Sequence, residues 1–210
     1  QQNTEEQRDS ILGTWMLVPG GFATSGPQFM MDYLNEDGRA AVLNYNPFTD
    51  DPTYRCEPVA IRRTWGAPGT PLSITREGDD VVIRHEWMDA VRVVHMDQDA
   101  APAGTEPSIL GYSVGHFEND VLVIETTHYT EGVLNQFVEV EGEPMRGLLH
   151  SDQLRTVERL SVDRERNRLI MSMDHFDPAW FTRDFPNYTR EYRPSDLPIE
   201  PFGCIPEQLK

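Results

Sequence analysis

The stretch from Ser73 to Asp97, SITREGDDVVIRHEWMDAVRVVHMD, indicates how the chain folds. Apolar and polar residues alternate with a period of two on both sides of Glu77-Gly78-Asp79-Asp80, and again on both sides of the turn at Asp89. This pattern predicts consecutive antiparallel strands joined by tight turns. It also divides the side chains into two faces, one with Val81, Ile83, His85 and Trp87 and the other with Val82, Arg84, Glu86 and Met88.

Two further hairpins follow the same pattern, with turns at Glu118-Asn119-Asp120 and at Asp163 to Asn167. Earlier in the chain we expect strands at Leu12 to Val18, Phe29 to Leu34 and Arg39 to Tyr45. No helix longer than two turns is predicted, because no segment repeats its apolar residues at helical spacing over a greater length.

The predicted fold class is all-β, a single antiparallel β-barrel with long covering loops. On the order of ten short strands in meander order favour closure, because a closed barrel has no free sheet edge. We expect a flexible N-terminus at 1–10, the barrel domain at 11–193 and a C-terminal tail at 194–210 that packs on the barrel. The irregular stretches Asn46 to Pro71 and Asp97 to Ser108 are expected to cover it.

Charge and hydropathy restrict the partners. Thirty-five acidic and 18 basic residues give a net charge of −17, which repels nucleic acid and anionic lipid headgroups. The longest apolar runs have four residues, as in Val121 to Ile124, so membrane insertion is not expected. The predicted partner is a small hydrophobic or aromatic molecule, and the chain is expected to be a monomer or a homodimer.

The two cysteines, Cys56 and Cys204, lie in neither a Cys-x-x-Cys nor a Cys/His ligand spacing. A bridge between them would restrict the unfolded chain and fasten the proline-rich tail, while two unpaired buried thiols are the alternative. The first residues, Gln1-Gln2-Asn3, are typical of a chain from which a signal peptide was cut. We therefore expect a periplasmic or secreted protein.

Two resemblances support this interpretation. LGTWMLV, residues 12–18, resembles the Gly-x-Trp opening strand of the calycins, the lipocalin and fatty-acid-binding-protein group, which implies a calycin-like barrel. EDGRAAV, DDPTYRCEP, SVGHFENDVLVIETT and HSDQLRTVERL, with a cysteine near the C-terminus, are similar to a family of uncharacterised exported bacterial proteins. That family commonly has Trp-Glu-Gly-Asp where this chain has Phe117-Glu118-Asn119-Asp120. The resemblance implies export and a β-rich fold, and it leaves the function open.

Histidines are the first candidates for chemistry. His85, His95, His116 and His175 each end a row of alternating apolar residues, so an inward orientation would gather them at one barrel opening. In HSDQLRTVER, His150 and Asp152 point the same way along a strand, which gives the imidazole–carboxylate pair that acid–base catalysis needs. The alternative for each ring is a half-buried histidine bonded to a carbonyl, and for Ser151 and Asp152 the start of a strand.

Candidate binding residues surround the first hairpin. Glu86 and Arg92 flank its turn, either as an exposed ion pair or as a buried pair that binds a carboxylate or phenolate. Aromatic residues are expected to line an apolar pocket or to fill the core: Trp65, Trp87, Tyr112, Phe176, Trp180, Phe181, Phe185, Tyr188 and Tyr192. Of these, Trp87, Tyr112 and Trp180 are the predicted substrate-binding residues.

The leading hypothesis is an exported enzyme that performs acid–base chemistry, as a lyase, isomerase or cyclase, on a small hydrophobic or aromatic compound inside the barrel. His150 and Asp152 are the predicted proton-transfer pair, with His116 and His175 as further catalytic candidates. No cofactor and no metal are expected, because dinucleotide, phosphate-loop, haem-attachment and metal-ligand motifs are absent from the sequence. The alternative is a lipocalin-like binding protein without catalysis.

Overall fold

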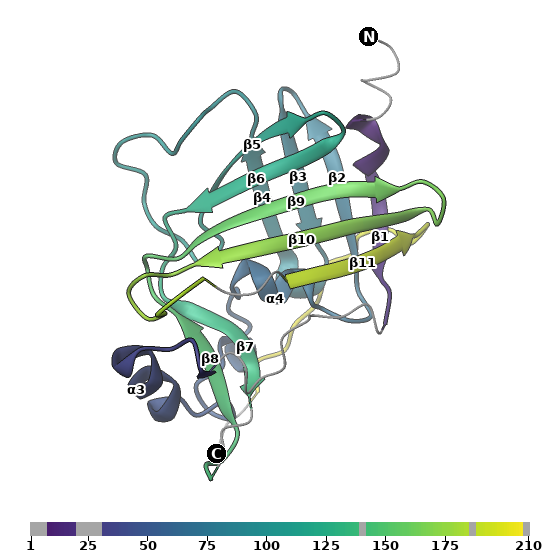
Figure 1. The fold of residues 1–210 in the computed structure, drawn as a ribbon. Coiled ribbons are helices and arrows are strands. Elements are labelled where there is room, and N and C mark those ends of the chain that lie inside the picture. Colours follow the sequence, from purple (N-terminus) through teal and green to yellow (C-terminus); the bar gives the residue numbers. More distant parts are fainter. Residues whose placement is uncertain (1–7, 20–30, 139–141, 185–187, 208–210) are drawn as a thin grey trace.

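The computed structural model describes residues 8–19, 31–138, 142–184 and 188–207. Within these residues nine strands close into a barrel, in the order β1-β11-β10-β9-β6-β5-β4-β3-β2 (Figure 1). The barrel strands are β1 (Gly13–Leu17), β2 (Pro71–Glu77), β3 (Asp80–His85), β4 (Ala90–His95), β5 (Tyr112–Glu118), β6 (Val121–Thr127), β9 (Arg155–Asp163), β10 (Arg168–Phe176) and β11 (Tyr188–Pro194). The predicted barrel is confirmed, and so are the hairpins β2–β3, β3–β4, β5–β6 and β9–β10.

The prediction of a purely antiparallel sheet was wrong. Strand β4 pairs with β5 in parallel, with Val94 opposite Ser113 and His95 opposite Val114. A parallel pair needs a crossover connection, and residues 96–111 supply it. The barrel is therefore mixed.

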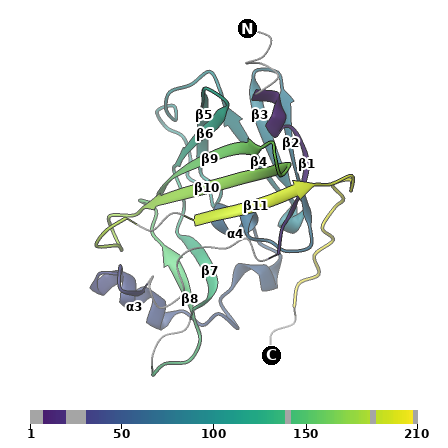
Figure 2. The ribbon, with the colours of Figure 1, turned by 45° about the vertical axis from the view of Figure 1, so that its right-hand side comes forward.

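A second sheet lies outside the barrel. Strands β7 (Gly132–Val138) and β8 (Arg146–His150) form a bulged hairpin, and β6 pairs directly with β9 past this insertion. The hairpin hangs below the barrel beside helix α3 (Glu36–Asn44), as Figures 1 and 2 show.

The strand predicted at Arg39 to Tyr45 was wrong, because these residues lie largely in α3. Asn35 caps this helix by accepting a hydrogen bond from the amide of Gly38, and Glu36 and Asp37 occupy its first turn. The predicted strand at Phe29 to Leu34 begins outside the described residues. Its described part contains one isolated bridge, from Leu34 to Phe181.

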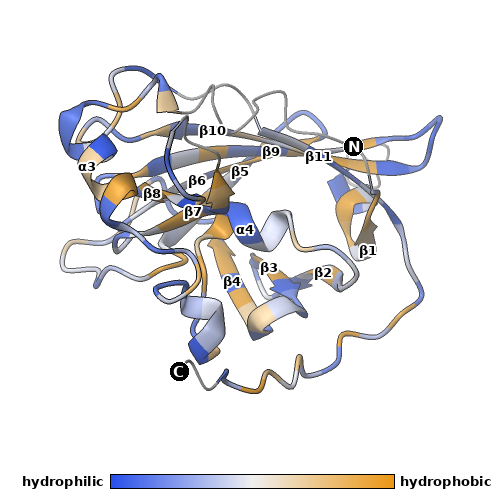
Figure 3. Ribbon diagram, turned by 90° about the horizontal axis from the view of Figure 1, so that it is seen from below, coloured by the Kyte–Doolittle hydropathy of each residue, from blue (hydrophilic) through white to orange (hydrophobic). Residues whose placement is uncertain are grey.

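The expected covering stretch at Asn46 to Pro71 contains two short helices, η2 (Pro52–Arg55) and α4 (Ile61–Trp65). Helix α4 lies between the β7–β8 hairpin and the ends of β2, β3 and β4 (Figure 3). All five of its residues are buried. It therefore closes this end of the barrel as part of the core, and it is not a loose lid.

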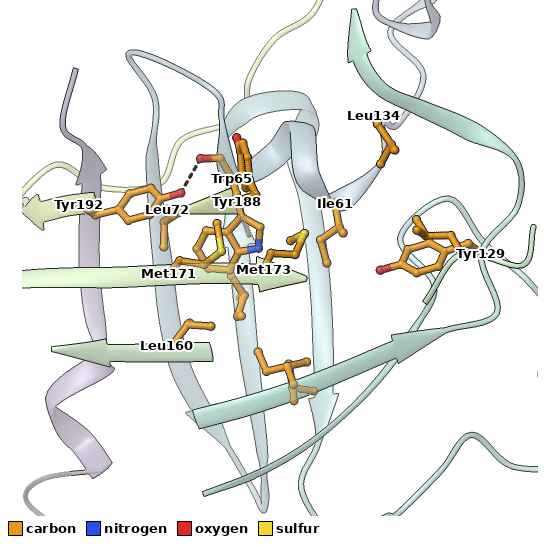
Figure 4. Packing of buried hydrophobic residues seen from close by; sticks show 14 of the residues in the cluster. Ile61, Trp65, Leu72, Tyr129, Leu134, Leu160, Met171, Met173, Tyr188 and Tyr192 are labelled. Carbon is orange, nitrogen blue, oxygen red and sulfur yellow. Dashed lines mark hydrogen bonds between the residues drawn. The ribbon is translucent and has the colours of Figure 1, made fainter. Parts of the chain in front are cut away.

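Large apolar side chains fill the interior of the barrel. Trp65 from α4 packs with Tyr192, and Leu72, Leu160, Met171 and Met173 from the strands surround them (Figure 4). The row Leu169, Met171, Met173 and His175 is buried, as the alternation along β10 predicts. The expected open lumen is thus occupied by side chains.

A disulfide joins Cys56 to Cys204, which confirms the predicted bridge. The C-terminal tail also contacts the body through its backbone: the amide of Glu200 donates to Glu86, and that of Phe202 donates to Asp89. Disulfides are typical of oxidising compartments outside the cytoplasm. The helices of the described segments are all too short or too polar to cross a lipid bilayer.

Candidate functional site

Helix α4 is fixed to the barrel through Trp65. The indole Nε1 donates a hydrogen bond to the carboxylate of Glu158 on β9, and the backbone oxygen of Trp65 accepts one from the hydroxyl of Tyr192 (Figure 4). The guanidinium of Arg92 on β4 also binds Glu158, with Nη2 at 3.0 Å from Oε1. All these groups are buried, so α4 has a rigid base.

The short helix also buries two adjacent arginines. Arg63 binds Asp51 with both terminal nitrogens, at 2.8 and 3.3 Å. Tyr45 donates its hydroxyl to the same carboxylate at 3.2 Å, and burial together with the charge of Asp51 raises the pKa of this tyrosine. Because Asp51 is fully buried, it holds its cation in a fixed position.

Arg62 faces Tyr188 on β11. Its guanidinium carbon lies 4.2 Å from the centroid of the Tyr188 ring, and that of Arg190 lies 3.9 Å from the same centroid. Burial is the main cause that lowers the pKa of Arg62, to about 10, and the nearby charge of Arg190 lowers it further. Arg62 is still cationic at neutral pH.

These arginines line a cleft beside α4, which we call the α4 cleft, with a volume of about 310 Å³. Its walls come from α4 and the loop after it, from the turn that follows β3, and from β7 and β11. The lining residues are Arg62, Arg63, Gly66, Ala67, Pro68, Trp87, Leu134, Asn135, Gln136, Phe137, Tyr188 and Arg190. The cleft therefore combines cationic groups, side-chain amides and an apolar wall.

The predicted pair of His150 and Asp152 does not form. His150 is fully buried, with Nδ1 at 2.9 Å from the carbonyl oxygen of Ser151, whereas Asp152 is exposed. The buried carboxylate at this place is Asp177, which accepts hydrogen bonds from the amide and the hydroxyl of Ser151 at 2.7 and 2.6 Å. Strand β8 ends at His150, so the alternation that would align residues 150 and 152 stops there.

His175 lies near His150 and near the α4 cleft. Its ring centroid is 6.4 Å from that of Tyr188. Burial lowers the pKa of His175 well below its usual value, and the charges of Arg62 and His150 lower it further. Burial also lowers the pKa of His150. Both rings are therefore neutral at pH 7.

The prediction that four histidines face inward was wrong for two of them. Val91 and Val93, which precede His95 in its row, are 50% and 39% exposed. His95 stacks on Tyr112 on the outer face, and His116 is exposed beside Glu118. The inward row of β4 instead contains Arg92, whose burial is explained by its ion pair with Glu158.

The prediction that Glu86 pairs with Arg92 was also wrong. The carboxylate of Glu86 accepts a hydrogen bond from the backbone amide of Glu200 in the C-terminal tail, while Arg92 points into the barrel toward Glu158. The turn after β3 contains a short 3₁₀ segment, η3 (Trp87–Asp89), with Met88 in a left-handed conformation. This irregular turn breaks the symmetry that would place the two side chains opposite each other.

Of the predicted binding aromatics, only Trp87 lines the α4 cleft, together with Tyr188 from the wider aromatic set. The hydroxyl of Tyr112 donates a hydrogen bond to Gln98 on another part of the surface. The backbone oxygen of Trp180 accepts a hydrogen bond from the amide of Asn35 beside α3. Phe185 lies outside the described residues. The three predicted binding aromatics are therefore spread over separate parts of the molecule.

A second cleft, of about 440 Å³, opens beside Asp177. Gln153, Phe176, Phe181 and Arg183 are among its lining residues. The described residues contain no group of three or more histidine, cysteine, aspartate or glutamate side chains placed to hold a metal ion.

Sequence reasoning missed Arg62, Arg190, Asp51, Glu158 and Asp177. Arg62 and Arg63 follow an apolar run at Val59 to Ile61 and precede Trp65, which is a local sign of a buried helical turn. Glu158 lies on the same face of β9 as Thr156 and Leu160. The opposite face of this strand also combines polar and apolar residues, so the alternation does not show which face is inside. Their partners are far away in the sequence, so no local pattern pairs them.

No family model matches the chain, and no curated protein is significantly similar to it. The fixed cations of the α4 cleft, beside an apolar wall, can bind and orient a small molecule.

Proposed function

We propose that this protein binds a small organic molecule in the α4 cleft and carries it without chemical change, outside the cytoplasm. The observation that supports this most directly is the α4 cleft itself, where Arg62, Arg63 and Arg190 meet Trp87 and Tyr188. A concave site with an apolar wall and a few fixed polar groups is typical of small-molecule sites. The disulfide supports the oxidising location.

A calycin-like barrel fits this proposal. Strand β1 contains the Gly13-x-Trp15 pattern, and Trp15 is buried with its indole nitrogen bonded to the carbonyl of Ile11 in the preceding 3₁₀ turn. The calycin group binds small molecules inside the barrel. Here the interior is filled and α4 closes one end, so we place the ligand beside α4.

The location of binding can be tested by NMR on the full chain. The four tryptophans give four indole N–H signals, which Trp→Phe variants assign. A small-molecule fragment library should yield ligands that shift the Trp87 signal and leave that of Trp15 unchanged. Gln136→Phe, which fills the α4 cleft, should abolish the shifts, while Ser161→Phe on β9 should not. The proposal fails if no fragment moves the Trp87 signal.

The second candidate function is the acid–base enzyme of lyase or isomerase type. It is favoured by the neutral rings of His150 and His175, the second of which lies against Tyr188 of the α4 cleft, and by the Ser151–Asp177 contact beside the second cleft. A neutral imidazole is a proton acceptor. The test follows the fragment ligands by NMR over time: conversion that is lost in His150→Ala, with binding retained, establishes an enzyme, and unchanged ligands exclude it for those compounds.

A further inference from the structure

We infer that the ligand of the α4 cleft is a small planar carboxylate, such as an aromatic monocarboxylate, whose charge is met by Arg62 and Arg190 beside Tyr188. This inference rests on the proposed function, because it specifies the chemical class of ligand for the same cleft. It is carried by the charge distribution, the burial and the size of the α4 cleft.

The charge distribution points to an anion. The chain has a net charge of −17, yet three of its 18 basic side chains line one cleft. Arg63 is neutralised by its two contacts with Asp51. Arg190 forms no ion pair with any residue in the described segments; it donates to the carbonyl of Thr189 and lies over Tyr188. An anion in the cleft would supply it with a counter-charge.

Burial strengthens this argument. Arg62 is 4% exposed, and its guanidinium and that of Arg190 lie against the same tyrosine ring, that of Tyr188. Both desolvation and like-charge repulsion oppose the charge on Arg62, as its lowered pKa shows. A carboxylate here would relieve both effects, and a planar guanidinium matches a carboxylate with two parallel hydrogen bonds.

Size and hydropathy favour an organic ligand with one ring. A volume of about 310 Å³ is at the lower end of the range for small-molecule pockets. Leu134, Ala67, Pro68 and Trp87 give the cleft an apolar wall, which inorganic phosphate would leave unused. The amides of Asn135 and Gln136 supply further donors for the carboxylate oxygens.

The test uses 4-fluorobenzoate, observed by ¹⁹F NMR, with the folded, oxidised full chain. Benzoate, its neutral analogue benzamide and inorganic phosphate are then added as competitors. We expect benzoate to displace the probe at least about tenfold more effectively than benzamide, since a charge-assisted hydrogen bond is worth a factor of that order. Phosphate should compete poorly.

Variants test whether 4-fluorobenzoate binds in the α4 cleft. Arg190→Gln should weaken 4-fluorobenzoate binding about tenfold or more, and Arg190→Lys should restore part of the affinity because it returns the charge without the planar fork. Arg168→Gln is the matched control, because Arg168 lies on β10 outside the lining of the α4 cleft and its side chain donates to the carbonyls of Arg166 and Asn167. The ¹⁵N spectrum of each variant confirms that it is folded.

The possible results separate the two proposals. Equal binding of benzamide and benzoate, equal competition by phosphate, or unchanged affinity in Arg190→Gln would overturn the carboxylate assignment and leave small-molecule binding intact. The same holds if 4-fluorobenzoate fails to bind while other fragments shift Trp87. If neither 4-fluorobenzoate nor any fragment reaches the cleft, the proposed function fails as well.

Discussion

The indole of Trp65 on α4 donates a hydrogen bond to the carboxylate of Glu158, which lies 93 residues further along the chain on β9. Arg92 on β4 binds the same carboxylate, and Trp65, Glu158 and Arg92 are all buried. This contact fastens the helix that closes the barrel to the barrel wall. It thereby fixes Arg62 and Arg63, which lie on the same short helix as Trp65 and line the α4 cleft.

Removing Glu158 should therefore be strongly destabilising. Glu158→Leu leaves the charge of Arg92 buried without its partner and should lower the free energy of unfolding by about 3–5 kcal/mol. Trp65→Phe, which removes the indole donor and part of the buried ring but leaves the Arg92–Glu158 ion pair, should lower it by about 1–3 kcal/mol. The control is Arg159→Gln, which breaks an exposed ion pair with Asp174 and should change it by less than about 1 kcal/mol. Urea unfolding measures all three; equal effects would contradict the prediction.

The stability should fall as the pH drops below neutrality. Burial lowers the pKa of His85 to about 3, with the charge of Arg92 as a second cause, and it also lowers the pKa of His150 and His175. The unfolded chain binds protons at these rings below about pH 6.5, and the folded chain does not. The stabilisation that comes from keeping these rings uncharged is therefore complete above about pH 6.5. It is lost as the pH falls, by up to about 1.4 kcal/mol per pH unit for each ring.

The measurement is the free energy of unfolding between about pH 5 and pH 6.5, where most carboxylates are already ionised and the histidines of the unfolded chain titrate. His85→Gln should reduce the slope of the free energy of unfolding against pH by the contribution of about one bound proton. The control is Ser161→Gln on β9, which removes no titratable group and should leave the slope unchanged. A slope that is identical in wild type and His85→Gln would show that His85 does not contribute.

Reduction of the Cys56–Cys204 disulfide should lower the free energy of unfolding by about 2–5 kcal/mol. The two cysteines are 148 residues apart, so the bridge restricts most of the unfolded chain. Unfolding of the oxidised protein, the reduced protein and the Cys56→Ser/Cys204→Ser variant measures the effect. The last two should agree, and a thiol assay on the unfolded, unreduced protein should find no free thiol.

Gly66 provides a steric test of the α4 cleft. A Cβ at this position would lie 2.7 Å from the hydroxyl of Tyr188, so Gly66→Ala should displace this tyrosine and weaken ligand binding. The control is Gly69→Ala in the same loop. Nothing lies within 4 Å of its added Cβ, and its positive φ of 82° makes the substitution a backbone effect alone. The two variants should lose comparable stability, on the order of 1 kcal/mol, while only Gly66→Ala loses affinity for 4-fluorobenzoate.

Much of the barrel could be predicted from local patterns. The turn residues around Gly78, Asn119 and Asn167 define hairpins whatever the rest of the chain does, because they favour the tight turns that reverse a strand. Helix α3 was missed because its start, Asn35 to Gly38, has the composition of a turn, and only the capping contact of Asn35 distinguishes the two.

The candidate site was much less accessible to prediction. The alternation along β4 assigned Val91, Val93 and His95 to the interior on hydropathy, yet the structure buries Arg92. An arginine side chain can be buried inside a barrel when a carboxylate pairs with it there. The carboxylate that pairs with Arg92 belongs to Glu158, which is 66 residues away in the sequence. Likewise, Asp177 rather than Asp152 supplies the buried carboxylate near His150, because the strand ends before Asp152.

The sequence by itself determined the period-two strands, their turns, the acidic charge and a cysteine pair able to form a bridge, since each of these depends on neighbouring residues or on composition. Only the tertiary structure decided which face of β4 is inside, that α4 closes the barrel, and that Arg62, Arg190 and Tyr188 meet in one cleft. The physical reason is that a buried charge is stable only beside its partner, and the partners here come together only when the barrel closes.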